Sequence, residues 1–76
     1  MIKTGQIYKN KENEKKFAIT RKCGDDDIFE MVYSDGRTNS HSSDWIEVYG
    51  LLIAEYPTWQ EAVNSPEFNG EKHDNT

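Results

Sequence analysis

The sequence predicts a small, mainly β domain that also carries short helices. The chain has only 76 residues, which suffices for one small domain and excludes a TIM barrel or a doubly wound nucleotide-binding sheet. Short stretches of alternating, β-branched and aromatic residues recur between turn signals, as is typical of strands. Helix-capping patterns occur only near residues 42–47 and after Pro57, so the helices should be short.

The composition predicts a thin hydrophobic core. Hydrophobic residues make up 34% of the chain and charged residues 30%, and the mean hydropathy is −0.95. Two Trp, four Tyr and three Phe compensate in part, because each aromatic side chain buries a large area. We expect residues 1–68 to form a single domain. Residues 69–76 (NGEKHDNT) have no apolar anchor, and we expect them to be a disordered tail.

The first half of the chain contains two candidate strands. Residues 5–8 (GQIY) form the first, and residues 9–16 (KNKENEKK) should be an exposed loop because they include no apolar residue. Residues 17–22 (FAITRK) alternate, which places Phe17, Ile19 and Arg21 on one face of the second strand. The following CGDDD segment, residues 23–27, favours a turn.

The clearest strand signal lies in residues 28–34 (IFEMVYS). Phe29, Met31 and Tyr33 share one face, while Ile28 and Val32 share the other with Glu30, so the strand should be central and curved. Asp35-Gly36 follows it directly and indicates a type I′ hairpin. The returning strand, residues 37–41 (RTNSH), is polar throughout and should lie at an edge.

The second half predicts a helical turn, a strand and a terminal helix. Ser43 or Asp44 can cap a turn over residues 42–47, and residues 51–56 (LLIAEY) form the last strand. A continuous helix over residues 43–54 is the alternative, since only Gly50 interrupts the pattern. Thr58 to Glu61 is a capping box for a helix over 59–64, and Ser65-Pro66 starts one more turn. Trp45 and Trp59 should pack inward.

This order of elements resembles an SH3-like barrel. The segments that carry the resemblance are GQIY, FAIT, IFEMVYSDGR, SDWIEVY and LLIAEY, and together they span residues 5–56. The resemblance implies a five-stranded barrel with a helical turn before the last strand, here followed by a short C-terminal helix. GQIYKN stands where SH3 domains have their ALYDY-type stretch, so the resemblance does not extend to binding proline-rich peptides.

The charge is distributed unevenly along the chain. The net charge is −5 and the isoelectric point is near 4.9. Residues 1–22 hold seven Lys or Arg against two Glu, whereas residues 23–76 hold two against twelve Asp or Glu. The acidic part repels nucleic acid and favours a basic partner, although charge on a small domain also serves solubility.

An acidic face is therefore the first candidate binding site. A row of carboxylates can occupy a groove built to bind a phosphate backbone, and tyrosines beside it can act as interface anchors. The expected partner is a larger host protein with a basic groove. The residues that we expect to bind it are Asp25, Asp26, Asp27, Glu30, Tyr33, Asp35, Asp44 and Glu47.

The small size, the WIE segment and the PTWQEAV segment resemble small proteins of phages and prophages of Gram-positive bacteria. This resemblance implies a phage-encoded inhibitor, for example an anti-CRISPR protein acting on an effector such as Cas9. The start, MIKTGQIY, lacks the apolar region of a signal peptide, and Cys23 has no partner for a disulfide. We therefore expect a protein of the host cytoplasm that is monomeric and does not contact membranes, although the polar strand 37–41 leaves strand pairing open.

Nucleic-acid binding through the basic N-terminal third is the alternative function. Tyr8 and Phe17 lie among the basic residues, as stacking platforms would. The overall acidity argues against this function, because nucleic-acid-binding domains are usually basic. The basic residues proposed for it are Lys9, Lys11, Lys15, Lys16, Arg21 and Lys22.

Catalysis and metal binding are not expected. Ser40, His41 and Asp44 are close in sequence, but a strand end in so small a chain cannot enclose a substrate. Cys23 and His41 could meet near Asp44, and His73 is a further nitrogen ligand, yet the paired spacing of zinc sites is absent from the sequence. We therefore expect no cofactor and no metal.

Overall fold

The computed structural model describes residues 1–69, which form five strands and three short helices. The strands are β1 (Gln6–Asn10), β2 (Lys16–Lys22), β3 (Ile28–Tyr33), β4 (Thr38–Ser42) and β5 (Gly50–Glu55). The helices are α1 (Ser43–Tyr49), α2 (Trp59–Val63) and α3 (Pro66–Asn69). The expected mainly β fold class is confirmed. Residues 43–54 form α1 and most of β5, so the alternative of one continuous helix over these residues is wrong.

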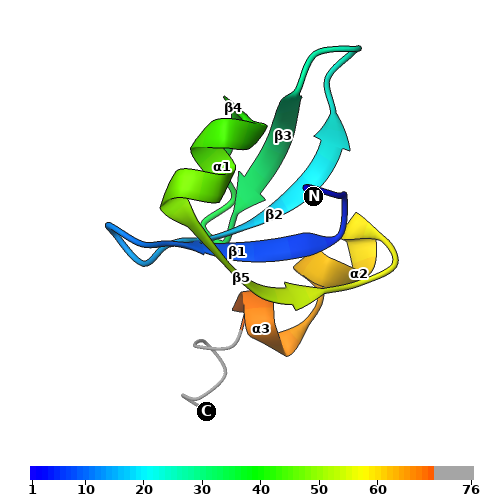
Figure 1. Cartoon of the computed structure of the whole chain (residues 1–76). Helices are drawn as coiled ribbons and strands as arrows, with labels where there is room; N and C mark the ends of the chain where they lie inside the picture. Colours follow the sequence, from blue (N-terminus) through cyan, green and yellow to red (C-terminus); the bar gives the residue numbers. More distant parts are fainter. Residues whose placement is uncertain (70–76) are drawn as a thin grey trace.

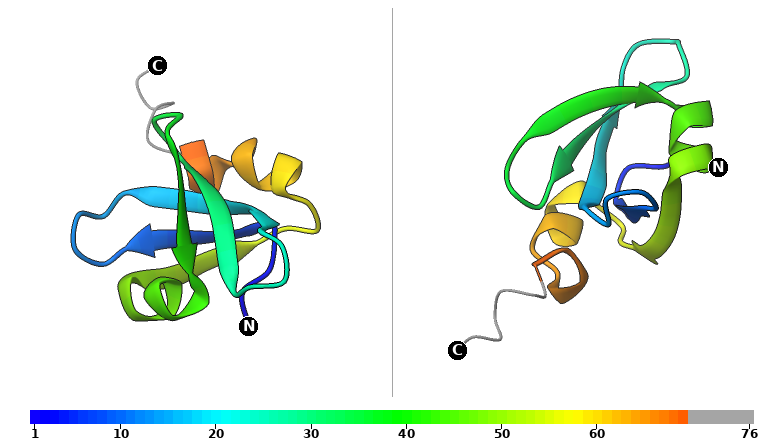
Figure 2. Two further views of the ribbon diagram at one scale, coloured as in Figure 1. Left: turned by 90° about the horizontal axis from the view of Figure 1, so that it is seen from above. Right: turned by 90° about the vertical axis from the view of Figure 1, so that its left-hand side faces the viewer.

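All five strands form one antiparallel sheet in the order β4-β3-β2-β1-β5 (Figure 1). The first strand lies between β2 and the last strand, while β4 and β5 form the two edges. Figure 2 shows that the sheet is strongly curved, and α1 contacts both edge strands. The edges do not pair with each other, so the sheet is not closed.

Each face of the sheet carries its own hydrophobic cluster. The inner-face cluster consists of Ile2, Tyr8, Phe17, Ile19, Phe29, Met31 and Ile46. The outer-face cluster consists of Ile7, Ala18, Ala62 and Phe68, and α2 and α3 cover it (Figure 1). Residues of β1, β2 and β3 alternate between the clusters, as the period of two along a strand requires. The sheet therefore serves as the middle layer of the domain, with packing on both sides.

The expected faces of β3 are confirmed. Phe29, Met31 and Tyr33 contribute to the inner cluster, and Val32 packs against the outer one. Tyr33 is half-buried, and its ring lies 5.5 Å from that of Phe17. Burial, with a smaller contribution from the charge of Asp35, raises the pKa of the Tyr33 hydroxyl.

Arg21 does not lie on the expected face of β2, because this strand contains a bulge. Ile19 pairs with Met31, but Arg21 pairs with Glu30 and Lys22 with Phe29, so the register shifts around Thr20. The extra residue reverses the alternation beyond it. Arg21 therefore lies on the outer face, opposite the face of Ile19, and Lys22 takes the inner side.

The turn between β3 and β4 is a hairpin, but not of type I′. A type I′ turn needs positive φ at both central residues, and only Gly36 has it here, at 93°. Gly36 N–H donates to the Tyr33 carbonyl at 2.9 Å, and Tyr33 N–H donates to the Arg37 carbonyl at 2.7 Å. These bonds describe a three-residue loop that ends in a residue of positive φ.

The chain between β1 and β2 is less exposed than expected. β1 continues to Asn10, which is buried, so the exposed loop begins only at Lys11. The Asn10 side chain accepts hydrogen bonds from the backbone N–H groups of Glu12 and Asn13. A polar residue is buried here because its side chain builds the turn that follows.

Helix α1 has two turns rather than one, and Ser42 is its cap, not Ser43 or Asp44. The Ser42 hydroxyl accepts the Trp45 N–H at 3.1 Å. Ile46 is fully buried, and the Trp45 ring packs half-buried against the inner cluster. The helix ends at Tyr49, and Gly50 follows as its C-cap; an added Cβ on Gly50 would lie 2.6 Å from the Ile46 carbonyl oxygen.

The cap gives a direct test of this assignment. We expect Ser42→Ala to lower the free energy of unfolding by about 1 kcal/mol, because one N–H of the first helical turn loses its acceptor. Ser43→Ala is the matched control and should change stability by less than about 0.5 kcal/mol. Urea denaturation followed by circular dichroism measures both. An equal loss in the two variants would contradict the assignment of Ser42.

Both expected caps of the C-terminal helices are confirmed. The Thr58 hydroxyl accepts Glu61 N–H at 3.2 Å, and the Ser65 hydroxyl accepts Phe68 N–H at 3.3 Å. Trp59 was expected to pack inward, but it is 38% exposed. Asn69, expected in the tail, is the last residue of α3. The rest of the expected tail lies outside the described residues.

The N-terminal segment crosses one end of the curved sheet and closes the inner cluster there. Ile2 is buried in that cluster. Gly5 follows with a φ of 90°, and an added Cβ would lie 2.2 Å from the Tyr56 carbonyl oxygen. Tyr56 N–H donates to the Gly5 carbonyl at 2.9 Å, and Gly5 N–H donates to the Ile19 carbonyl at 3.0 Å. Only glycine allows this close crossing of two backbones.

Candidate functional site

The structure brings five of the predicted acidic residues to one end of the molecule. Residues 24–27 form an exposed turn between β2 and β3. The Ser43 N–H donates to the Asp27 carbonyl at 2.9 Å, which fixes this turn against the start of α1. We call this region the acidic end; its residues are Asp25, Asp26, Asp27, Asp44 and Glu47, and all five are exposed.

A hollow of about 310 Å³ lies beside this contact and is lined by residues of both the turn and α1. Asp27 and Glu47 line it, and Ile2 and Phe29 contribute apolar surface. Lys22 also lines the hollow because of the β2 bulge. Carboxylates around an apolar floor suit the side chain of Lys or Arg, which combines an aliphatic stem with a charged head.

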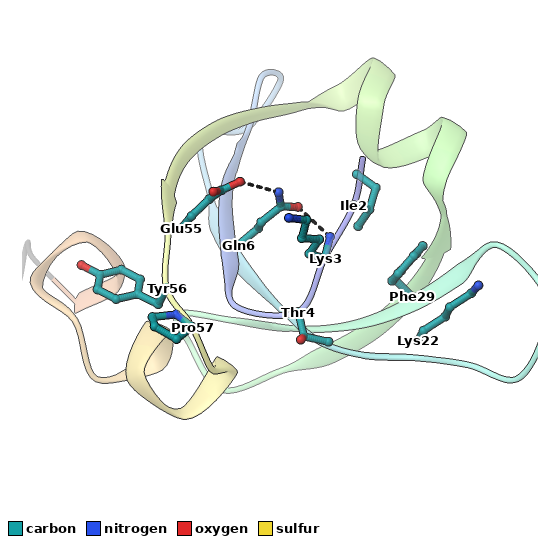
Figure 3. Close-up of a pocket in the computed structure, with 9 residues that line it drawn as sticks. All are labelled: Ile2, Lys3, Thr4, Gln6, Lys22, Phe29, Glu55, Tyr56 and Pro57. Atoms are coloured by element: carbon teal, nitrogen blue, oxygen red, sulfur yellow. Dashed lines mark hydrogen bonds between the residues drawn. The ribbon is translucent and has the colours of Figure 1, made fainter.

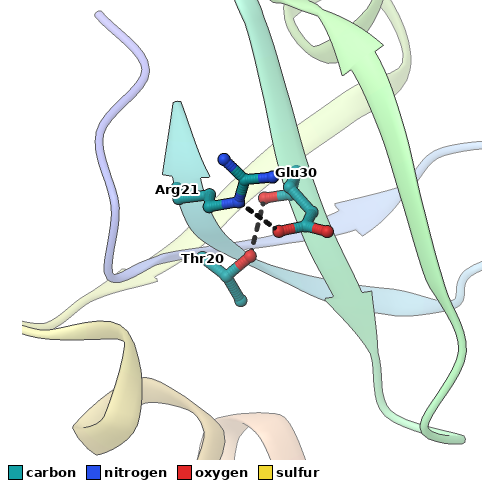
Figure 4. Close-up of polar contacts among 3 residues, drawn as sticks. All are labelled: Thr20, Arg21 and Glu30. Atoms are coloured by element: carbon teal, nitrogen blue, oxygen red, sulfur yellow. Dashed lines mark hydrogen bonds and ion pairs between the residues drawn. The ribbon is translucent and has the colours of Figure 1, made fainter. Parts of the chain in front are cut away.

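The structure places three predicted residues elsewhere. Glu30 lies on the outer face, where its carboxylate accepts a hydrogen bond from Arg21 Nε at 2.8 Å (Figure 4). Asp35 lies in the turn at the opposite end of β3, beside Arg37. β3 is six residues long, so this turn is roughly 20 Å from the acidic end. Tyr33 lies at that distant end too and packs against Phe17.

The predicted basic residues also divide into groups. Lys9 and Lys16 are cross-strand neighbours in the β1–β2 hairpin, and Lys11 and Lys15 lie in its loop. The ammonium groups of Lys11 and Lys16 donate to the carbonyls of Val48 and Glu67. Arg21 and Lys22 are separated from this hairpin and face opposite sides of the sheet.

The expected stacking role of Tyr8 and Phe17 is wrong. Phe17 is fully buried and Tyr8 is 6% exposed, so neither ring is accessible to a nucleobase. The Tyr8 hydroxyl donates to Gln6 Oε1 at 2.8 Å. Burial raises the pKa of this hydroxyl, and the carboxylates of Glu47 and Glu55 raise it further.

A second hollow, with a volume of about 700 Å³, lies beside the N-terminal segment (Figure 3). Its lining residues are Ile2, Lys3, Thr4, Gln6, Lys22, Phe29, Glu55, Tyr56 and Pro57. Gln6 is buried at its base: its Nε2 donates to Glu55 at 2.8 Å, and its Oε1 accepts the Lys3 N–H at 2.8 Å. The hollow shares Ile2, Lys22 and Phe29 with the one beside the acidic end, so the two are neighbours.

An apolar groove of about 460 Å³ lies on the outer face, where α2 and α3 leave β3 uncovered. Val32, Val63 and Phe68 line it, together with the exposed Trp59. The Arg21–Glu30 pair lies along the same groove. Sequence reasoning did not identify this groove, because its position depends on how α2 packs on the sheet.

Within residues 1–69, the side chains considered for catalysis and metal binding are not gathered into one centre. The His41 ring stacks on Trp45 with 3.6 Å between ring centroids, and burial lowers the pKa of the imidazole. Ser40 occupies the next position of β4, so its side chain faces the other side of the sheet. Within residues 1–69, no cluster of three or more His, Cys, Asp or Glu side chains could hold a metal ion. His73 lies outside the described residues.

Comparison of the chain with protein-family models, with curated proteins and with solved structures finds no match. Among residues 1–69, no helix is long and apolar enough to cross a membrane.

Proposed function

We propose that this protein is a non-catalytic binding protein whose acidic end enters a basic groove of a larger, nucleic-acid-handling protein. The observation that carries this proposal is the bond from Ser43 N–H to the Asp27 carbonyl. It holds the acidic turn against α1, so that five carboxylates project from one end. Such a cluster attracts a basic groove at long range and competes there with phosphates.

The proposal also covers the SH3-like fold, the identity of the partner and the site of action. The strand order, and the helix between the fourth and fifth strands, support an SH3-like barrel that has remained open. With the resemblance to small phage proteins, the partner that we propose is a host defence protein such as a CRISPR effector. The site of action is then the host cytoplasm.

The test is a charge reversal at the acidic turn. In a pull-down of tagged protein from a Gram-positive bacterial lysate, Asp25→Lys, Asp26→Lys and Asp27→Lys together should abolish capture of the partner, because attraction becomes repulsion. The matched control combines Glu12→Lys, Glu14→Lys and Glu61→Lys. These three residues are also exposed, and their reversal changes the net charge equally.

Mass spectrometry with and without nuclease reads the result. The proposal expects one stoichiometric protein partner that survives nuclease treatment, is retained by the control triple variant and is lost with the turn variant. Equal loss in both triple variants would mean that only net charge matters, which would contradict a site at the acidic end.

Nucleic-acid binding is the second candidate function. The observation that favours it is the pairing of Lys9 with Lys16 in the β1–β2 hairpin, close to Lys11 and Lys15. Capture that depends on nucleic acid, and that Lys15→Glu with Lys16→Glu abolishes, would support this function. Removing a lysine that binds a phosphate should also reduce the salt dependence of binding.

A further inference from the structure

A polar hollow of about 210 Å³ lies between the β1–β2 loop and the β3–β4 turn. Both connections flank the same end of β2 and β3, because Phe17 pairs with Tyr33 and the Ser34 N–H donates to the Lys16 carbonyl at 3.1 Å. This end of β3 is opposite to the acidic end, so the hollow has no part in the function proposed for the acidic end. The side chains around it include Asn13, Lys15, Tyr33, Asp35, Arg37 and Asn39.

The amide oxygens beside the hollow are already occupied by local hydrogen bonds. Asn13 Oδ1 accepts the Lys15 N–H at 2.9 Å, and Asn39 Oδ1 accepts the Ser40 N–H at 2.9 Å. A backbone N–H can bond only to the oxygen of a side-chain amide, so these two bonds fix the orientation of both amides. Among residues 1–69, no acceptor bonds to either Nδ2 group. Each amide therefore keeps its NH2 group as a donor for a ligand.

The Asp35 carboxylate is directed toward Arg37. Its Oδ1 accepts the Arg37 N–H at 3.0 Å, and its Oδ2 lies 3.7 Å from Arg37 Nε. The guanidinium carries further N–H donors besides Nε, and the Arg37 side chain is 79% exposed. Burial raises the pKa of the Tyr33 hydroxyl, so this group stays protonated at neutral pH and can donate as well.

The charge around the hollow is positive, although the whole chain has a net charge of −5. Lys15 and Arg37 contribute two positive charges against the one negative charge of Asp35. The adjoining residues 9–16 hold four Lys against two Glu. Free donors and positive charge match a ligand that brings acceptors and negative charge, whereas a cation or an apolar group would leave the donors unpaired.

The number of donors favours phosphate over a carboxylate. A lysine, an arginine and two amides offer donors from four side chains, more than the two oxygens of a carboxylate can use well. A phosphate group brings more acceptor oxygens and more charge, and an arginine guanidinium binds it in bidentate fashion.

We propose that this hollow binds a phosphate group, with Lys15 and Arg37 neutralising its charge and the amides of Asn13 and Asn39 donating to its oxygens. The site is exposed to water, so a single phosphate group should bind in the millimolar range. Two sources carry this group: a free phosphorylated compound and the backbone of a nucleic acid. In the second case the site would extend the basic β1–β2 hairpin of the second candidate function.

A titration of the isotope-labelled protein with inorganic phosphate, followed by NMR, tests the site. Chloride replaces phosphate in the reference samples, so that the ionic strength stays constant. The backbone amide signals of Asn13, Lys15, Arg37 and Asn39 should shift and saturate with a Kd of roughly 1–10 mM. No saturable shift up to about 100 mM phosphate, or shifts confined to other parts of the chain, would overturn the proposal.

Two pairs of variants test which groups bind the phosphate. Arg37→Gln should weaken binding about three- to fivefold, as expected for one exposed ionic contact. Arg21→Gln is its matched control, because Arg21 is also an exposed arginine beside a carboxylate, and it should leave the Kd within about twofold. Asn39→Asp keeps the oxygen that accepts the Ser40 N–H but replaces the NH2 donor, so it should weaken binding by about fivefold or more.

Ser40→Asp is the control for Asn39→Asp. It adds the same charge on the opposite face of β4 and should change the Kd by no more than about twofold. Equal losses in a variant and its control would overturn the assignment of these groups. The dispersion of the amide signals shows that each variant is folded.

A second titration, with a short single-stranded oligothymidylate, distinguishes the two sources. Phosphate from a nucleic acid predicts shifts of the same four amides at concentrations about tenfold lower or less, with a Kd that rises with salt, because several phosphates bind at once. Phosphate from a small compound predicts no gain over inorganic phosphate. Either result supports the site, and binding of the oligothymidylate at other residues only, without saturation of the hollow by inorganic phosphate, would contradict it. Both titrations use purified protein, so their outcome is separate from that of the pull-down.

Discussion

Gly5→Ala should lower the free energy of unfolding by about 3–5 kcal/mol, from left-handed strain together with steric overlap. Gly5 has a φ of 90°, and a Cβ there would lie 2.2 Å from the Tyr56 carbonyl oxygen. The neighbouring atoms are backbone, which cannot turn aside as a side chain would. The crossing also holds the start of β1 against the end of β5. Its disruption should therefore destabilise the whole sheet.

Gly24→Ala is the matched control for this prediction. Gly24 also has positive φ, at 64°, but an added Cβ would meet no atom within 4 Å. Gly24→Ala should lower the free energy of unfolding only by the strain of the left-handed conformation, about 1–2 kcal/mol. Urea denaturation followed by tryptophan fluorescence measures both variants. Equal losses of stability in the two variants would show that the close approach of Gly5 to Tyr56 does not add to the cost of Gly5→Ala.

Phe17→Ala should destabilise the protein by about 3–5 kcal/mol, the usual cost of removing a buried phenyl ring. Phe17 is fully buried, and its ring contacts those of Tyr8, Tyr33 and Trp45 at centroid distances of 5.5–6.1 Å. A small domain often has a total stability of only about 5 kcal/mol. The variant should therefore be largely unfolded at 37 °C.

Trp59→Ala provides the comparison for Phe17→Ala. Tryptophan is the larger side chain, but Trp59 is 38% exposed, whereas Phe17 is 0% exposed. Its removal should cost less than about 2 kcal/mol, because water already covers part of the ring. Thermal denaturation by circular dichroism ranks the two variants. A larger loss for Trp59→Ala would contradict the assignment of Phe17 to the centre of the core.

Much of the fold could be predicted from local sequence patterns. The alternation in residues 28–33 gave the correct faces of β3, and the patterns at Thr58 and Ser65 located two caps. These signals succeed because a strand repeats every two residues and a cap involves residues only three apart. The prediction of a type I′ turn at Asp35 was wrong, because Asp-Gly is compatible with more than one hairpin geometry.

Features that depend on distant partners could not be predicted. The β2 bulge exists only in relation to β3, and nothing in FAITRK marks Thr20 as the extra residue. As a result, Arg21 and Lys22 each lie on the face of β2 opposite to the predicted one, and Arg21 forms an ion pair with Glu30. The alternation rule fails in this way wherever a strand contains one unpaired residue.

The same limit applies to the candidate site. Charge counting found the acidic residues, but the bond between Ser43 and Asp27, which joins the turn to the helix that carries Asp44 and Glu47, links residues far apart in the sequence. Asp35 belongs to the same stretch of sequence, yet the length of β3 carries it to the other end. The exposure of Leu51 and Leu52 was also hidden, because an LLIA run suggests burial until its position at an edge is known.

The central position of β1 has a consequence for how quickly the chain can fold. β1 pairs with β2 through a short loop, but its other neighbour is the last strand, and the bond between Gln6 and Glu55 joins residues 49 apart. Loop closure over that span must be overcome before the pairing contributes any stability. We therefore expect β1, β2 and β3 to associate early. Docking of β5 onto β1 should then be the slow step, on the millisecond-to-second scale typical of small proteins with many non-local contacts.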